Sequence, residues 1–279
     1  MLRKVDTTES QGFLAHYRIP PLSFVPHARL PRVIRPVWEA LNAGNPAMAI
    51  MRARHILLTH QPATQSERAA LKVGLAAAEL YSGASDGARR LAGHALDLYP
   101  GQWSAHRIIL TILTAQRAYK AAYMHLVSLA PAGPVPLWDE PLSEQERHLA
   151  LASWAWHLAE WETVAHHLQA AYPQGLETLP PALLEDWFRL SFYRNQPEEA
   201  AAAAALLIAE RPAQSADEVL QTLVQCGWTK EALPLYRTAF AREPRSELLR
   251  RRLVALCIRE GKLDEARALT QPGALSLAA

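Results

Sequence analysis

The stretch that decides the fold is Gly227-Trp-Thr-Lys-Glu-Ala232-Leu-Pro-Leu-Tyr236-Arg-Thr-Ala239, which is followed by Pro244. It sets a small residue, an aromatic residue and alanines at fixed intervals, and the intervals return in Gly261-Lys-Leu-Asp-Glu-Ala266. Ala232 and Ala266 are 34 residues apart. Self-similarity at such a period is typical of proteins built from stacked structural repeats.

The pattern continues toward the N-terminus. Ala200 precedes the alanine of the quoted copy by 32 residues, and Ala88 precedes Ala122 by 34. Looser copies surround Val164 and Gly44-Asn-Pro46. A helical hairpin explains the pattern, because two antiparallel helices approach closely only over small residues and a proline ends the second helix.

At these positions the chain resembles the tetratricopeptide repeat (TPR) family and TPR-like helical repeats, over roughly residues 33 to 270. The resemblance implies an all-α protein, an α-solenoid of about seven antiparallel helical hairpins that form a right-handed superhelix. An alanine- and leucine-rich composition with only 12 glycines agrees with a mostly helical chain.

Differences in composition divide the chain into segments. An arm with four prolines comes first, and a second run of prolines interrupts the hairpins, where we expect a long connection and a break in the superhelix. The expected segments are the arm 1–32, N-terminal hairpins 33–130, the connection 131–142, C-terminal hairpins 143–270 and a tail 271–279.

The arm contains Pro20, Pro21, Pro26 and Pro31, which together forbid a long helix. Because apolar residues such as Phe13, Leu14 and Phe24 stand among the prolines, we expect an extended segment that lies on the helical body. The alternative is a proline-rich ligand for a partner's aromatic groove.

Charge and hydropathy exclude several classes of function. A formal charge of +2 is too small for a nucleic-acid binder. We find neither an apolar stretch of membrane-spanning length nor a secretory signal, so we expect a cytoplasmic protein without membrane insertion. Cys226 and Cys257 lack metal-binding spacing and are expected to be packed. The alanine-rich composition suggests a bacterial source.

Catalysis and metal binding have no support in the motifs. His148, His157, His166 and His167 do not repeat at one-turn spacing, so we expect no metal site and no cofactor. The acidic pairs that begin at Asp139, Glu185 and Glu198 lie near expected helix starts, where capping explains them. No phosphate loop, dinucleotide fingerprint or nucleophile elbow occurs, and we expect no enzyme.

The resemblance places a partner on the concave surface formed by the first helix of each hairpin. We expect a protein partner that offers an acidic and apolar segment, and we expect Trp156 to be partly exposed while Trp154, Trp161, Trp187 and Trp228 pack between helices. The expected groove residues are Arg107, Thr111, Ser153, Trp156, His157, Arg189, Phe192, Tyr193, Gln221, Gln225, Arg251 and Arg259.

The sequence thus favours a non-catalytic scaffold, adaptor or assembly factor. One alternative is a helical enzyme or small-molecule-responsive regulator whose cavity is covered by residues 131–141. Another is a structural segment of a larger complex without a groove ligand. The apolar C-terminal end, 274–279, also suggests self-association.

Overall fold

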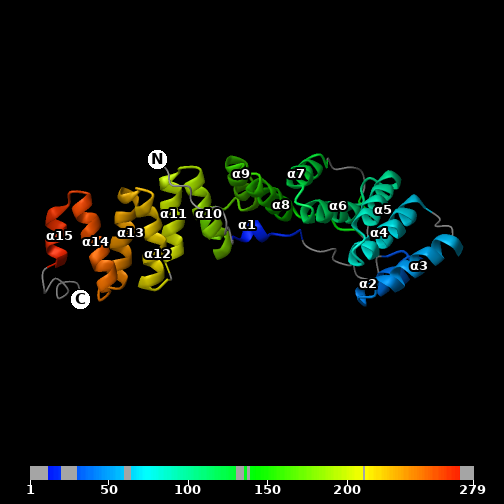
Figure 1. Ribbon diagram of the computed structural model, residues 1–279, viewed down its shortest axis with the longest axis horizontal. Helices are drawn as coiled ribbons and strands as arrows, with labels where there is room; N and C mark the ends of the chain where they lie inside the picture. Colours follow the sequence, from blue (N-terminus) through cyan, green and yellow to red (C-terminus); the bar gives the residue numbers. More distant parts are fainter. Residues whose placement is uncertain are drawn as a thin grey trace. The chain divides into compact units, whose positions relative to one another are not determined.

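The computed structural model describes residues 12–19, 30–59, 64–129, 135–136, 139–209 and 211–270. Every regular element in these ranges is a helix, and consecutive helices pack together from α2 to α8 and from α9 to α15 (Figure 1). The prediction of an all-α solenoid of helical hairpins is therefore confirmed. No helix in the described ranges is long and apolar enough to cross a membrane.

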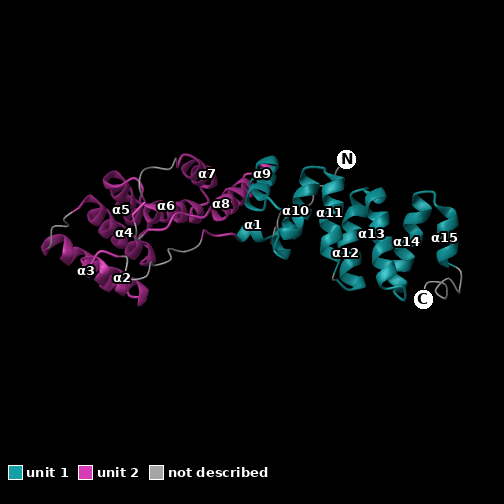
Figure 2. Cartoon of the chain, turned by 180° about the vertical axis from the view of Figure 1, so that it is seen from behind, with its two compact units in different colours: residues 1–16, 161–279 teal, residues 17–160 magenta. Residues whose placement is uncertain are grey.

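The chain forms two compact units (Figure 2). Unit 2 is Tyr17–Glu160, and unit 1 is Met1–His16 with Trp161–Ala279. The division falls after the eighth helix, and the predicted connection at 131–142 stays a prediction. The described part of the connection is bonded to the rest of unit 2 through Asp139.

In unit 2, the first helices of neighbouring hairpins contact one another, α2 with α4 and α4 with α6, and each also packs against its own second helix. This contact pattern defines the two layers of a helical solenoid. The helices are α2 Arg35–Asn42, α3 Pro46–Thr59, α4 Gln65–Tyr81, α5 Ser85–Leu98, α6 Trp103–Ala115, α7 Tyr119–Val127 and α8 Glu144–His157.

Unit 1 has the same layering, because α12 contacts α14 in one layer and α11 contacts α13 in the other. A short helix from the N-terminal arm, α1, packs on α10. The elements are α1 Phe13–His16, α9 Trp161–Ala171, the 3₁₀ helix Leu176–Thr178, α10 Pro181–Tyr193, α11 Pro197–Ile208, α12 Ala213–Gln225, α13 Thr229–Arg242, α14 Glu247–Arg259 and α15 Leu263–Thr270.

The alanines that revealed the repeat are the crossing points of the helices. Each lies in the second helix of a hairpin, where a side chain larger than a methyl group would hold the two helices apart. All five are fully buried or nearly so: Ala88, Ala122, Ala200, Ala232 and Ala266.

The turn inside a hairpin needs a left-handed backbone. Gly227 and Gly261, which begin the two quoted copies, have φ angles of 86° and 72°. Glycine adopts this conformation at little cost and ends the first helix of the hairpin. Asn195 takes the same place in the preceding copy with a φ angle of 53°.

Asp139 ties the connection to the first turn of α6. It accepts hydrogen bonds from the backbone N–H of Ser104 at 3.0 Å, from the Ser104 hydroxyl at 2.6 Å and from the Gln102 side chain at 3.1 Å. Arg107 Nη2 donates a further hydrogen bond to the carbonyl oxygen of Glu140 at 3.2 Å. The described part of the connection is therefore anchored to α6.

Of the arm, the structure describes residues 12–19 and 30–32. Residues 13–16 are helical where the sequence predicted an extended segment, and Leu14 is fully buried. Tyr17 and Ile19 pack on the core formed by α6, α7 and α8. Pro20, Pro21 and Pro26 lie outside the described residues, as do the tail 271–279 and its predicted role in self-association.

Candidate functional site

Helix α14 presents one exposed face that mixes apolar and cationic side chains. Arg251, Ala255 and Ile258 are spaced by four and three residues, so they lie on one side of the helix. All three are exposed, and Ile258 keeps 55% of its surface in solvent. Leu248 and Arg259, also exposed, flank this line. We call these five residues the α14 face.

The charge of α14 is strongly positive, because four arginines and one acid leave a formal charge of +3. Glu247, the acid, accepts a hydrogen bond from Arg251 Nε at 2.9 Å and pairs with Arg250 at 2.6 Å. The hydrogen bond from Arg251 is the main reason why the pKa of Glu247 is lowered. Arg259 has no partner within the described residues and leaves its guanidinium available.

A network of polar side chains fixes α12 against α13 and α14. The Tyr236 hydroxyl of α13 donates to Asp217 Oδ1 at 2.7 Å and accepts from Gln221 Nε2 at 2.6 Å. Arg252 Nε of α14 lies 3.4 Å from the same Asp217 oxygen. Burial, assisted by Asp217, raises the pKa of Tyr236, so its hydroxyl stays protonated. Gln221, predicted to face a partner, therefore stabilises the helical body.

Aromatic residues at the end of α10 pack in pairs. Phe192 stacks on Trp228 with ring centroids 4.8 Å apart, and Tyr193 stacks on Trp161 at 4.3 Å. Both tryptophans thus pack between helices, as the sequence predicted. Tyr193 remains 36% exposed, and Gln225 at the end of α12 is also exposed. These two stay available for contact with a partner.

Helix α10 holds the segment 12–16 of the arm. Leu14 donates its backbone N–H to Asp186 Oδ2 at 2.7 Å, and both residues are fully buried. Gly12 packs so tightly on this carboxylate that a Cβ would collide with Asp186 Oδ1. Arg189 Nη1 lies 3.6 Å from the same oxygen. The segment therefore contacts α10 beside Arg189, which the sequence predicted to face a partner protein.

The carboxyl group of Asp186 is not fully satisfied. Burial raises its pKa to about 6, although the N–H of Leu14 and the charge of Arg189 favour the ionised form. Its Oδ1 receives no hydrogen bond from the described residues. A buried acceptor with spare capacity is costly to the fold, and such groups often mark functional sites.

Three of the predicted groove residues in unit 2 are buried: Arg107, Ser153 and Trp156. Trp156 is only 6% exposed, so the expectation of an exposed ring is wrong. The reason is that α8 is buried on all sides from Leu149 to Trp156, whereas the repeat register assumes one solvent-facing side.

The other two predicted residues of unit 2 are exposed. Thr111 donates its hydroxyl to the Arg107 carbonyl at 2.8 Å, and His157 stacks on Tyr119 at 4.1 Å. The five predicted residues of this unit are thus divided between core and surface.

A histidine pair links α6 to α7. His106 Nδ1 lies 3.1 Å from His125 Nε2, and His106 Nε2 lies 3.1 Å from the Pro100 carbonyl. Burial lowers the pKa of His106 to about 4 and also lowers that of His125, so both rings are neutral at pH 7. Within the described ranges no group of three or more histidine, cysteine or acidic residues could hold a metal ion.

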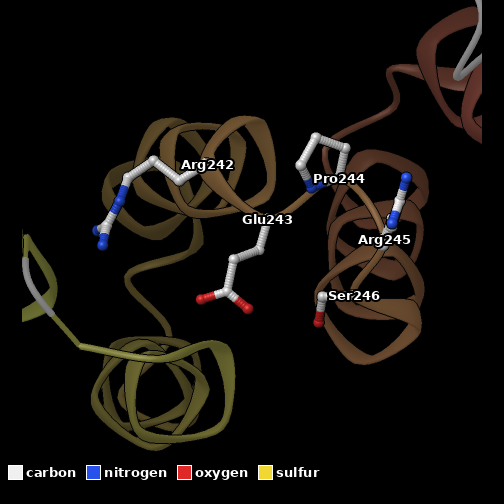
Figure 3. Close-up of a pocket in the computed structure, with 5 residues that line it drawn as sticks. All are labelled: Arg242, Glu243, Pro244, Arg245 and Ser246. Atoms are coloured by element: carbon white, nitrogen blue, oxygen red, sulfur yellow. The ribbon is translucent and has the colours of Figure 1, made fainter.

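A hollow of about 740 Å³ lies at the turn between α13 and α14 (Figure 3). Three of its lining residues form hydrogen bonds with backbone groups at the ends of helices. Glu243 accepts the backbone N–H of Ala213 at the start of α12, at 2.9 Å, and Arg242 donates to the Ile208 carbonyl at the end of α11. Ser246 accepts from the N–H of Leu249 in α14. These bonds explain the charged lining without a ligand.

Sequence reasoning missed the docked segment and the acid that holds it. Asp186 was interpreted as a capping residue, but it lies in the second turn of α10. The available signal was its position between Leu183 and Leu190, three residues before and four after, on a stripe that is fully buried. Cys226 was also predicted to be packed and is exposed.

A comparison with models of protein families finds no match. No curated protein matches the sequence. Among solved structures, the chain is similar to one titled "Crystal structure of APC/C hetero-tetramer Cut9-Hcn1", with 13% sequence identity and a TM-score of 0.41. The similarity covers 87% of this chain and 47% of that chain, so this chain spans about half of its length. At this identity and TM-score, the likeness does not bear on function.

Proposed function

We propose that the protein is a non-catalytic scaffold that binds a segment of a partner protein on the α14 face. The observation that carries the proposal is the exposure of Ile258 and Leu248 beside Arg251 and Arg259 on one side of the helix. A cytoplasmic location and a bacterial source belong to this proposal and remain predictions.

The composition of the α14 face suits an acidic and apolar segment. Ile258 gives an apolar anchor on an otherwise polar surface, and burying such an anchor supplies most of the affinity in many interfaces. Arg259 has no acid to pair with in the described residues, and its planar guanidinium can donate two hydrogen bonds to a carboxylate. Tyr193 and Gln225 are the other exposed residues predicted on the first helices of unit 1.

The test places a photo-reactive phenylalanine analogue on α14 of the full chain in its native cell. We choose Ala255, which lies exposed between Arg251 and Ile258, and we choose exposed Thr238 on α13 as the matched control position. We expect a cross-linked partner from position 255 and not from position 238. Peptide mass spectrometry then identifies the cross-linked segment, which we expect to contain acids next to an apolar residue.

A charge reversal supplies the second control. The double variant Arg251→Glu, Arg259→Glu should retain its helical circular dichroism, because both residues are exposed. The yield of the cross-linked adduct should fall by about tenfold, which corresponds to about 1.4 kcal/mol of binding free energy. The same adducts from both positions, an adduct only between two copies of this chain, or an unchanged yield in the double variant would each contradict the proposal.

A further inference from the structure

The contact between α1 and α10 has the features of a bound peptide. The segment 12–16 lies 172 residues from α10 at its hydrogen bond, so no local chain geometry imposes the contact. Leu14 contributes a main-chain N–H that donates to Asp186 and a side chain that is fully buried. Gly12 contributes a position where no side chain fits. A peptide from another protein could supply all three.

The contact selects for a short pattern. Gly12 is required because any Cβ collides with Asp186 Oδ1, a buried atom. Leu14 is required because its side chain is fully buried. Phe13 is 39% exposed and His16 is also exposed, so burial does not restrict the side chain at these positions as it does at Leu14. The pattern is glycine, any residue, leucine.

The receptor side is preformed in part. Asp186 and Arg189 lie one helical turn apart on α10, and their charged atoms are 3.6 Å apart. Asp186 Oδ1 and Arg189 Nη1 make no hydrogen bonds within the described residues, although both atoms are buried. A peptide with a better placed donor or acceptor would therefore gain bonds that the chain's own segment does not make.

We propose that the Asp186–Arg189 side of α10 is a peptide-binding site for glycine-any-leucine segments of partner proteins, and that residues 12–16 are its tethered resident ligand. The inference deepens the proposed function by naming a second contact on the same helical unit. The tether gives the resident segment an effective concentration on the order of millimolar at the site. A partner segment displaces it when the ratio of the partner's concentration to its dissociation constant exceeds the same ratio for the resident segment.

The test uses the full chain and an acetylated peptide of residues 11–16, Gln-Gly-Phe-Leu-Ala-His, with fluorine on its phenylalanine ring. In the wild-type chain, the resident segment fills the site. In Gly12→Val, the collision with Asp186 displaces it and opens the site. Fluorine NMR of the peptide should therefore give a dissociation constant at least about tenfold lower for Gly12→Val than for the wild type.

The matched control is Gly93→Val in α5, since a Cβ at Gly93 meets nothing within 4 Å. This variant should bind the peptide as weakly as the wild type. Peptides with valine for the glycine, or alanine for the leucine, should not bind Gly12→Val. The double variant Gly12→Val, Asp186→Ala should lose binding, and the two altered peptides test the same contacts if this variant does not fold.

Equal affinities of the wild type and Gly12→Val would overturn the inference, as would equal binding of the unaltered peptide and the valine peptide. Failure here is distinct from failure of the proposed function. The α14 variant Arg251→Glu, Arg259→Glu should bind the peptide normally after Gly12→Val is added, because its substitutions lie on another helix. The cross-link from position 255 tests the α14 face independently.

Discussion

Two buried aspartates each hold a segment that is not part of a hairpin, and they do so differently. Asp139 in unit 2 accepts bonds from the Ser104 backbone and hydroxyl, from the Gln102 side chain and from the backbone of Glu140. Asp186 in unit 1 accepts one bond, from Leu14, and its Oδ1 receives none within the described residues.

The different number of hydrogen bonds at Asp139 and Asp186 indicates which of the two contacts is permanent and which can exchange. Burial raises the pKa of both carboxyl groups. For Asp139, the bonds from Ser104 oppose that rise by stabilising the charge. A carboxylate with a full set of donors fixes its segment, because any displacement leaves several buried donors without partners. Asp186 loses a single bond when its segment leaves, which suits a site that exchanges ligands.

The largest effect that we predict is that of Asp139→Ala. The substitution leaves the Ser104 N–H and the Gln102 amide without their acceptor, and each buried donor left unpaired costs about 2 kcal/mol. We expect a loss of about 4 kcal/mol in the free energy of unfolding, measured by urea denaturation. Asp139→Asn, which keeps one acceptor oxygen, should lose less. Equal losses for the two variants would contradict the assigned bonding.

The next effect is the pH dependence caused by Asp186. Burial raises its pKa from 3.8 to about 6 in the folded chain. The N–H of Leu14 and the charges of Arg189 and His16 oppose the rise, and Glu185 adds to it. The folded state thus holds the proton more tightly than the unfolded state. The resulting stability is fully present below pH 3.8 and is lost as the pH rises through about 6.

We expect Asp186→Asn to remove this dependence, because an amide does not ionise in this range. Relative to the wild type, the variant should gain up to about 3 kcal/mol in unfolding free energy between pH 3.8 and pH 7, since each pKa unit corresponds to about 1.4 kcal/mol. Thermal melts at several pH values measure the gain. A difference between the two proteins that stays constant with pH would show that the Asp186 carboxyl keeps an ordinary pKa.

The fold could be predicted because the signal is local. Alanines such as Ala232 and Ala266 recur one hairpin apart, and each contact that they make involves neighbouring helices. Arg251 and Arg259 were predicted to lie on the concave surface, and both are exposed on α14. Their place on that surface stays a prediction, which rests on helical register alone. The exposure of Ile258 between them was not predicted, because an isoleucine in a repeat helix is ordinarily expected in the core.

The site on α10 could not be predicted from the same reasoning. Leu14 and Asp186 are 172 residues apart, and a repeat register contains no information about which helix receives a terminal arm. Trp156 was placed in solvent because the register treats all hairpins alike, whereas α8 is buried on all sides near its end. Departures from regular repetition therefore mark the places where the sequence pattern alone is insufficient.

The smallest predicted effect is that of Arg189→Gln. The charge of Arg189 lowers the pKa of Asp186 across a distance of 3.6 Å, but its side chain is 41% exposed and water screens the interaction. We expect the pKa of Asp186 to rise further, by less than about one unit, with a loss below about 1 kcal/mol at pH 7. Carbon-13 NMR of the Asp186 carboxyl group measures the shift directly.

Because the residue next to this pair is Gly12 of the docked segment, a pKa that falls in Arg189→Gln would mean that the segment has left and water has reached Asp186. That outcome would show that Arg189 binds the docked segment itself, in addition to its effect on the pKa of Asp186.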